Sequence, residues 1–274
     1  MPFTISHAAA VLPFVRRDGS GRGPLVPALL VAGSFAPDLT YYAAGAVPGA
    51  MEFGAFTHSF TGVFTVDVVL ALAVVALWRL IREPVLGLVP GRLRGRLGAV
   101  VRPRPRTGWW PLWWYVSASL GATTHVVWDA FTHPGRWGLR LFPVLAETFA
   151  GFPLYWYVQY AGSAAALIVL AAFAWWAVRG AEPAPPSPPA GNRWLAWTLI
   201  AGCACAAGTL RVARWLSYVN GADLTWQPWE LVPTLCFGAG AGIALGVVLY
   251  ALVTRTRAAQ SPPASAAISS PSGD

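Results

Sequence analysis

The chain has 274 residues, of which 56 % are hydrophobic and only 11 % are charged. This composition excludes an ordinary soluble domain and indicates an integral membrane protein, because several long runs carry almost no charge. The net charge of +8 could suggest a nucleic-acid partner. The basic residues, however, are all arginines that lie in connecting segments beside apolar runs. Cytoplasmic loops of membrane proteins carry their charge in this way, so we expect no nucleic-acid binding.

The amino-terminal region contains two short apolar segments, residues 3–15 and 24–36, separated by an arginine-rich turn. Each segment is shorter than the roughly 20 residues that a full membrane span needs. We therefore predict a short helical hairpin that is tilted or half-embedded in the bilayer. If its turn faces the cytoplasm, His7 and Asp38 finish at the opposite end, at similar heights.

Two apolar runs with an arginine-rich segment between them follow. Residues 39–57 contain no basic residue and read as an external loop, and the next apolar run covers 58–78. Residues 79–106 carry eight arginines and are therefore predicted to be cytoplasmic, with part of this loop lying on the anionic leaflet as a basic helix over 90–101. The run 109–131 then returns to the outer face.

The rest of the chain predicts three further crossings. The segments are an external loop (132–153), a span (154–178), a proline-rich linker (181–193), two spans (194–215 and 231–253) and a disordered tail (255–274). The fold class is thus an all-α polytopic membrane helix bundle of about five full spans plus the amino-terminal hairpin. We divide it into a site-bearing membrane domain (1–180), the linker, a carboxyl-terminal helix pair (194–254) and the tail.

This architecture predicts a multi-pass protein of the inner (plasma) membrane whose first partner is the lipid bilayer. Gly238, Gly242 and Gly246 recur every four residues in the last span, a spacing that favours close helix contact and predicts self-association. The three cysteines lie inside apolar runs without zinc-ligand spacing, so we interpret them as small packing residues.

The histidines and two aspartates form the candidate site. His125, Asp129 and His133 are four residues apart and therefore share one face of a helix at its outer end. The topology brings further groups of the same kind to this interface. Imidazole nitrogens and carboxylate oxygens suit a divalent metal, zinc first, with manganese or iron as alternatives. The predicted ligands are His7, Asp38, His58, His125 and Asp129, and the predicted catalytic residues are Asp129 and His133.

Each of these residues also has a simpler interpretation when it is taken alone. His58 or His133 could cap a helix end, and His125 with Asp129 could be a hydrogen-bonded pair inside the bundle. Asp38 could be a turn residue after a proline. The joint interpretation is favoured because ionisable groups near a membrane interior are costly and tend to mark function.

Four arginines near the outer side are candidates for binding a phosphate or a carboxylate. Arg136, Arg140 and Arg211 are the predicted substrate-binding residues, and Arg214 belongs to the same group. The alternative is that each reaches a lipid headgroup. Asp67 differs from all of these because it lies deep in its span; we favour a structural pairing inside the bundle over a proton relay.

The motifs resemble a known group of membrane proteins. Met1–Pro13, Gly33–Asp38, Phe56–Phe60 and Gly121–Pro134 resemble the uncharacterised bacterial membrane family DUF 4184. The order His, Pro-Asp, Thr-His-Ser, His-x-x-x-Asp is more loosely similar to inner-membrane metal-dependent hydrolases of the YdjM type. The chain departs from that second pattern after Pro37-Asp38 and before Thr57-His58, where two of the ligands of those hydrolases are missing. This departure argues against a second metal. His133 is a candidate to replace one of the missing ligands.

These features predict a metal-dependent hydrolase that acts on a phosphoester or a lipid-linked substrate near the outer membrane face. The first alternative is a proton- or ion-coupled transporter that uses Asp67 and the histidines. The second is a non-catalytic membrane scaffold. The three differ in one geometric expectation, because only a metal site requires the five predicted ligands to surround a common point.

Overall fold

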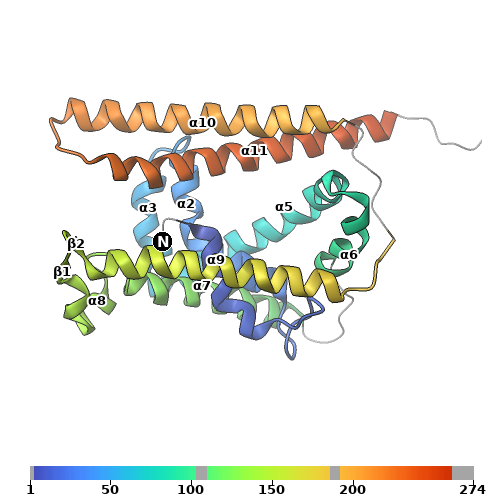
Figure 1. The fold of residues 1–274 in the computed structure, drawn as a ribbon, viewed down its shortest axis with the longest axis horizontal. Coiled ribbons are helices and arrows are strands. Elements are labelled where there is room, and N and C mark those ends of the chain that lie inside the picture. The colour runs from blue at the N-terminus through green and yellow to red at the C-terminus, as the bar shows by residue number, and fades with distance from the viewer. Residues whose placement is uncertain (1–2, 103–109, 186–191, 261–274) are drawn as a thin grey trace, which may run out of the picture.

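A computed structural model of the protein describes residues 3–102, 110–185 and 192–260, and helices dominate it (Figure 1). In chain order the elements are η1 (Thr4–Phe14), α1 (Pro27–Phe35), η2 (Ala36–Asp38), α2 (Leu39–Ala43), α3 (Ala50–Thr57), α4 (Phe60–Phe64), α5 (Val66–Leu88), α6 (Gly91–Val101), α7 (Trp110–Ala130), α8 (Trp137–Leu141), η3 (Pro143–Ala146), β1 (Thr148–Phe149), β2 (Phe152–Pro153), α9 (Leu154–Gly180), α10 (Arg193–Gly221), η4 (Pro228–Glu230) and α11 (Leu231–Gln260). The two strands form one short hairpin. The predicted all-α class is confirmed.

Three helical segments are long and apolar enough to cross a membrane, fewer than the five that the sequence predicted. They are α9, α10 and the segment Pro228–Arg257, which holds most of α11. The second half of α5 carries Arg79, Arg82 and Glu83, which interrupt its apolar character. Helix α7 opens with tryptophans and continues with serines, threonines and a histidine, so its hydropathy is also lower. Among the described residues, the five predicted spans are therefore corrected to three candidate spans.

The predicted amino-terminal hairpin is present. Its arms are η1 and α1, and an antiparallel bridge between Val15 and Gly21 closes the turn. Because a 3₁₀-helix rises by about 2.0 Å per residue, η1 reaches further along the bundle than an α-helix of equal length would. His7 and Asp38 consequently finish on the same side, as the sequence predicted. The basic helix expected over 90–101 is also present, as α6.

Helices α1 and α7 make the closest backbone contact near the site. A Cβ on Gly33 would lie 2.2 Å from the carbonyl oxygen of Ala118, and one on Gly121 would lie 2.2 Å from that of Leu30. Both distances are far inside van der Waals contact, so only glycine fits at these positions. Small residues that let backbones approach are typical of helix packing in membranes. The contact brings the end of α1 directly beside His125 of α7.

The glycine stripe of α11 packs inside this chain. A Cβ on Gly242 would lie 2.2 Å from the carbonyl oxygen of Cys203, and one on Gly246 would lie 2.6 Å from the Cα of Ile200. The stripe therefore joins α10 to α11, and the predicted self-association cannot use this surface while the pair is intact. Helix α11 also continues to Gln260, past the predicted start of the tail, and residues 261–274 lie outside the described residues. Most of the linker, 186–191, lies outside them as well.

The long helices define two ends of the molecule. Helix α9 runs along one side and the α10–α11 pair along the other, with the short amino-terminal elements between them (Figure 1). Arginines of α6, the end of α9, the start of α10 and the end of α11 lie at one end of the molecule. The start of α9 and the end of α7 lie at the opposite end, and the candidate site lies there.

Candidate metal centre

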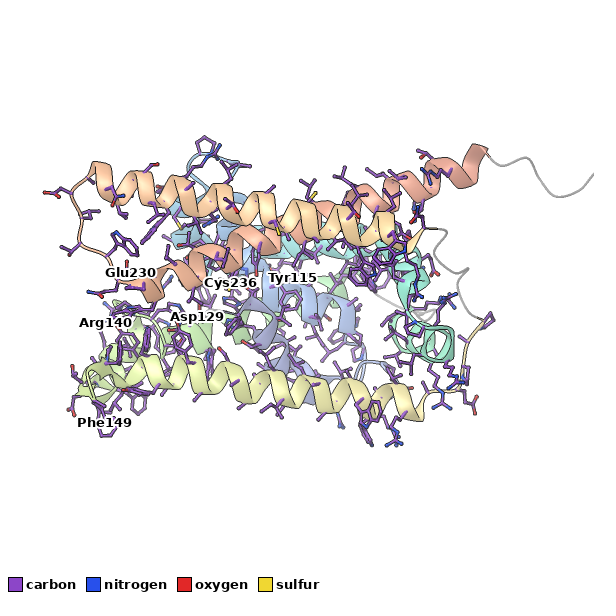
Figure 2. All side chains as sticks on the ribbon, turned by 45° about the horizontal axis from the view of Figure 1, so that its top comes forward. Tyr115, Asp129, Arg140, Phe149, Glu230 and Cys236 are labelled. Carbon is purple, nitrogen blue, oxygen red and sulfur yellow. The ribbon has the colours of Figure 1, made fainter. Side chains whose placement is uncertain are left out.

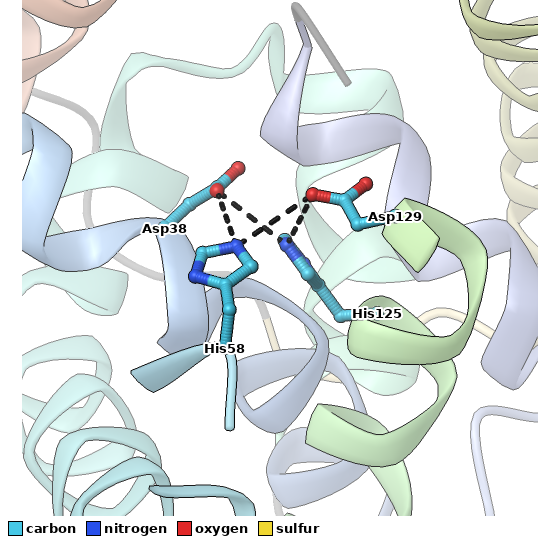
Figure 3. Close-up of side chains that lie close together, drawn as sticks. All are labelled: Asp38, His58, His125 and Asp129. Atoms are coloured by element: carbon cyan, nitrogen blue, oxygen red, sulfur yellow. Dashed lines mark ion pairs between the residues drawn. The ribbon is translucent and has the colours of Figure 1, made fainter. Parts of the chain in front are cut away.

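Four buried side chains converge at this opposite end of the bundle: Asp38, His58, His125 and Asp129 (Figure 3). They come from η2, the end of α3 and two turns of α7. The Nε2 atom of His58 lies 3.5 Å from Asp38 Oδ1 and 3.6 Å from Asp129 Oδ2. The Nε2 atom of His125 lies 3.4 Å and 3.5 Å from the same two oxygens. One ligand atom of each residue lies within 4.8 Å of all the others.

The nitrogen–oxygen distances in this group match those between neighbouring ligands of a small metal ion. Zinc binds imidazole nitrogen and carboxylate oxygen at about 2.0–2.1 Å, and tetrahedral ligands at that distance are about 3.3–3.4 Å apart. The four nitrogen–oxygen distances of 3.4–3.6 Å match this edge length. Octahedral ligands at the same bond length would be closer, at about 3.0 Å. The four side chains could therefore hold one metal ion among them.

Backbone carbonyls fix the orientation of both imidazoles. His125 Nδ1 lies 2.7 Å from the carbonyl oxygen of Ser34, and His58 Nδ1 lies 2.8 Å from that of Gly54. A carbonyl only accepts, so each Nδ1 carries the proton and donates it. In the neutral ring Nε2 is then a bare acceptor that points at the carboxylates, and His125 Nε2 has no hydrogen-bond partner among the described residues. Metal-ligating histidines show this second hydrogen bond almost always.

The carboxylate of Asp38 is held from two sides. Thr4 Oγ1 donates to its Oδ2 at 2.5 Å, which leaves Oδ1 facing the imidazoles. Thr57 Oγ1 donates to the carbonyl oxygen of Pro37 at 2.8 Å and so ties the residue before His58 to the residue before Asp38. Both threonines are buried. This hydrogen bond joins the sequence pairs Pro37-Asp38 and Thr57-His58 beside the contact between His58 and Asp38 themselves.

His7 lies beside the cluster without belonging to it. Its ring stacks on that of His125 with centroids 3.5 Å apart, and its Nε2 is 3.5 Å from Asp129 Oδ1, the oxygen that points away from His58. It is absent from the group of four whose ligand atoms lie mutually close. The prediction that His7 approaches the site is thus confirmed in position, and its part in metal binding stays a prediction.

His133 stands at the rim of the cluster. Its Nδ1 is 3.5 Å from Asp129 Oδ2, and its Nε2 is 3.2 Å from the side-chain nitrogen of Gln159 in α9. Burial lowers the pKa of His133 to about 4, against the opposing effect of the Asp129 charge. The ring is therefore neutral at neutral pH and is a weak proton acceptor.

The ionisation of Asp38 and His58, which lie outside the three membrane spans, follows from their mutual contacts. Burial alone would raise the pKa of Asp38, but His125 and His58 outweigh it and hold the pKa well below its usual range. Burial alone would lower the pKa of His58, but the contacts with Asp129 and Asp38 outweigh it and raise the pKa. Without a metal, a proton thus takes the place of the cation that two facing carboxylates require.

A cavity of about 480 Å³ opens above the cluster. Asp38, His58 and Asp129 form its floor, whereas His125 lies behind them and is fully buried. Further lining residues come from α9 and from the start of α11, and they are mostly aromatic. The remaining lining side chains are Tyr41, Met51, His133, Arg136, Trp156, Gln159, Tyr160, Trp229, Glu230, Pro233 and Phe237.

Of the predicted substrate-binding arginines, Arg136 lines this cavity. Its Nη1 donates to the carbonyl oxygen of His58 at 3.4 Å, and it also bonds to the Tyr41 side chain. Arg211 instead donates to the carbonyl oxygen of Tyr41 in α2 at 2.6 Å, and Arg214 donates to that of Gly45 in the loop after α2. Arg140 is exposed on α8, away from the lining.

Asp67 does not have the structural partner that the sequence suggested. Its side chain is fully buried in the first turn of α5, and among the described residues neither of its oxygens has a hydrogen-bond partner. It does not line the cavity above the cluster.

Sequence reasoning missed the residues that hold the ligands in place. Thr4 and Gln159 had no assigned role, and the carbonyls of Ser34 and Gly54 act through the backbone, which leaves no side-chain signal. Thr57 could have been found, because a buried hydroxyl directly before a ligand histidine is a common supporting residue.

Comparison with known proteins decides the family. The sequence model described as "Domain of unknown function (DUF4184)" matches residues 1–252. The chain belongs to the DUF4184 family. No curated protein matches the chain, so the looser similarity to metal-dependent hydrolases gains no support. No solved structure matches it either. The DUF4184 match covers all the site residues, two of the three candidate membrane spans completely, and the third as far as residue 252.

Proposed function

We propose that this DUF4184 protein is a metal-dependent hydrolase of the inner membrane that cleaves a phosphoester near the outer face. The observation that carries the proposal is the convergence of Asp38, His58, His125 and Asp129 on a common point, three of them at the floor of a cavity. Zinc is the favoured ion because the donors are imidazole and carboxylate.

Access from the cavity favours catalysis over a purely structural metal. A closed four-ligand site is typical of structural zinc, and such sites are usually rich in cysteine. Here no cysteine is present, and three of the four ligands face a cavity that could hold a substrate. Catalytic zinc can expand to five ligands, so a water from the cavity can be added to the four side chains. When bound, the metal lowers the pKa of such a water to about 7 and polarises the scissile group.

The side chains around the floor have separable tasks. Asp38 and Asp129 neutralise the ion, and the carbonyls of Ser34 and Gly54 hold the imidazoles with Nε2 unprotonated. His133 is neutral and close to Asp129, so it can accept or donate a hydrogen bond to a reacting water. With a pKa of about 4 it is too weak a base to remove the proton alone, which assigns that task to the metal–carboxylate pair.

Arg136 is the residue that points to a phosphoester. Its guanidinium lies at the wall of the same cavity and is the cation nearest to the floor among the lining residues. A guanidinium binds phosphate oxygens through two parallel hydrogen bonds and stabilises negative charge that develops during cleavage. An arginine beside a metal is thus a suitable pair for phosphoryl chemistry.

The test uses the full chain, purified in detergent. We expect about one metal ion per chain and slow hydrolysis of bis(p-nitrophenyl) phosphate, a generic phosphodiester. Asp129→Asn should lose both the metal and the activity. Arg136→Gln should keep the metal and lose about tenfold or more in activity, since it removes a charge-assisted contact to the phosphate.

Two matched controls accompany these variants. Asp223→Asn changes an exposed aspartate beyond α10, and Arg140→Gln changes the exposed arginine of α8; both should behave as the unmodified chain. Absence of stoichiometric metal, or equal metal content in Asp129→Asn and Asp223→Asn, would overturn the proposal.

A further inference from the structure

The cavity lies between the first turns of two membrane spans. Trp156 and Tyr160 line it from α9, and Pro233 and Phe237 line it from the span that contains α11. Helix α9 packs on η1 and α6, whereas α11 packs on α10, α5 and α2. The two spans run along opposite sides of the short helices in both views (Figures 1 and 2). The cavity therefore has one wall on each of two helices that face lipid.

Aromatic rings join these two walls at the outer end. Phe152, just before α9, meets Trp229 of η4 at 5.5 Å between centroids, and Trp156 meets Trp229 at 6.4 Å. Tryptophan and tyrosine favour the membrane–water interface, where their rings lie at headgroup level. Below this cluster the lining is Tyr160 and Phe237, one helical turn further into each span. The cavity walls on both spans are thus aromatic through their first two turns.

The charges that line the cavity indicate which kind of phosphate group it would bind. A divalent ion bound by two carboxylates is formally neutral, which leaves Arg136 as one positive charge on the cavity wall. Glu230 also lines the cavity, but it is exposed at the rim, where water screens it. One fixed positive charge complements a phosphodiester, which carries a single negative charge, better than a monoester, which carries about −1.5 to −2 at neutral pH.

The cavity is large enough for the headgroup of a phospholipid but not for its hydrocarbon chains. A volume of about 480 Å³ lies within the range of small-molecule sites and accommodates a phosphodiester head with its glycerol. A whole two-chain phospholipid is larger, so its chains would have to remain in the bilayer.

Resting on the proposed metal centre, we propose that the cavity binds a membrane phosphodiester lipid, with the phosphate between the metal and Arg136. Its hydrocarbon chains leave between α9 and α11, past Tyr160 and Phe237. The substrate class of the hydrolase is then a phospholipid taken directly from the outer leaflet.

The experiment uses the metal-loaded full chain in maltoside micelles, which contain no phosphate. The probe is phosphatidylglycerol with a diazirine on its acyl chain, and the matched probe is the same photoreactive diacylglycerol without the phosphodiester. Mass spectrometry maps the crosslinks. We expect phosphatidylglycerol to label the peptides of Tyr160 and Phe237 about tenfold more than diacylglycerol does, as a charge-assisted phosphate contact provides. Both probes should label Ile168 and Leu245, which are exposed to lipid, equally.

Two variants and two competing ligands test whether the labelling depends on Arg136 and on the hydrocarbon chains. Arg136→Gln should lower the cavity labelling to the diacylglycerol level with its metal content intact, and Arg140→Gln should leave it unchanged. Dihexanoyl phosphatidylglycerol should protect the cavity at lower concentration than glycerophosphoglycerol, which has the same head without chains.

Equal labelling by the two probes would overturn the proposal. Equal protection by the two competitors would also overturn it, in favour of a soluble phosphodiester. Metal content is measured on the same sample. A chain that binds metal and fails the labelling test contradicts only the lipid substrate, whereas a chain without metal contradicts the hydrolase itself.

Discussion

Two regions of this molecule bury carboxylates, and their surroundings differ completely. In the metal centre, Asp38 and Asp129 face two imidazole nitrogens each at 3.4–3.6 Å, and backbone carbonyls orient both rings. In the first turn of α5, Asp67 is equally buried, yet neither oxygen has a hydrogen-bond partner among the described residues. In the first region, imidazoles face the carboxylates and can compensate their negative charge. In the second region, no described group compensates the carboxyl of Asp67.

This difference shows which buried acids are part of a site. An ionised carboxylate without a partner is very costly to bury, so such a group usually becomes neutral. Asp38 and Asp129 instead face two imidazoles, which compensate the carboxylate charges either by carrying protons or by holding a metal cation between them. The same burial therefore indicates a ligand in one region and only a destabilising group in the other.

The largest expected effect separates the two regions directly. Asp129→Asn should lower metal affinity by more than about 100-fold, because it removes one ligand and half of the compensating charge. Asp67→Asn should leave the affinity within about twofold, because Asp67 is not among the four grouped ligands. A competition titration with a chelating dye measures both constants. A comparable loss in the two variants would mean that the regions form one functional unit, as a relay would require.

Acidification should release the metal from the centre. Metal binding needs an unprotonated His58, and the pKa of this residue is raised in the empty site by Asp129 and Asp38. Protons therefore compete from above about pH 6.5, the ordinary value for histidine, and affinity should fall about tenfold per pH unit for each proton displaced. The dye titration repeated from about pH 8 to pH 5.5 measures the slope. A constant affinity over this range would show that no imidazole is a ligand.

The hydrogen bond of Thr57 should have a smaller effect. Thr57→Val keeps the shape of the side chain and removes the donor to the carbonyl of Pro37, which ties His58 to Asp38. Supporting contacts of this kind are worth about 10-fold in metal affinity at their lower limit. Thr256→Val, in the last turns of α11, is the matched control and should change nothing. Unchanged affinity in Thr57→Val would mean that the backbone alone positions the two ligands.

The smallest expected effect concerns Asp67 itself. Replacing a buried, unpartnered carboxyl by valine removes a desolvation cost on the order of 1–3 kcal/mol, so Asp67→Val should be neutral or more stable. Thermal unfolding of the full chain in detergent, with metal present, measures the change. A clear loss of stability would reveal a partner for Asp67 and would weaken the contrast between the regions.

The site could be predicted from the sequence because its ligands lie at positions that topology alone places at one height. The spacing of His125 and Asp129 fixes one helix face, and the hairpin brings His7 and Asp38 to the same end. Helix geometry therefore sufficed to bring these groups together. It did not suffice to separate His7 from the four mutually close ligands, because a difference of a few ångströms depends on the stacking of His7 on His125.

The arginines and the span count show where such reasoning ends. Arg136 and Arg211 look alike in the sequence, and only the position of α2 decides that Arg211 donates to the carbonyl of Tyr41. The number of spans depended on where apolar runs stop, and charges within α5 shortened one of them. The roles of the arginines depend on contacts between segments that are distant in the sequence, and these contacts cannot be predicted from a single sequence.

X-ray absorption at the zinc edge of the zinc-loaded full chain tests the central claim most directly. Four nitrogen or oxygen neighbours at about 2.0–2.1 Å are predicted, with outer scattering from two imidazoles. In His125→Ala the signal of one imidazole should disappear. Sulfur neighbours at about 2.3 Å would place the ion on the cysteines of α10 and α11 instead, and a spectrum unchanged by His125→Ala would contradict the metal centre described here.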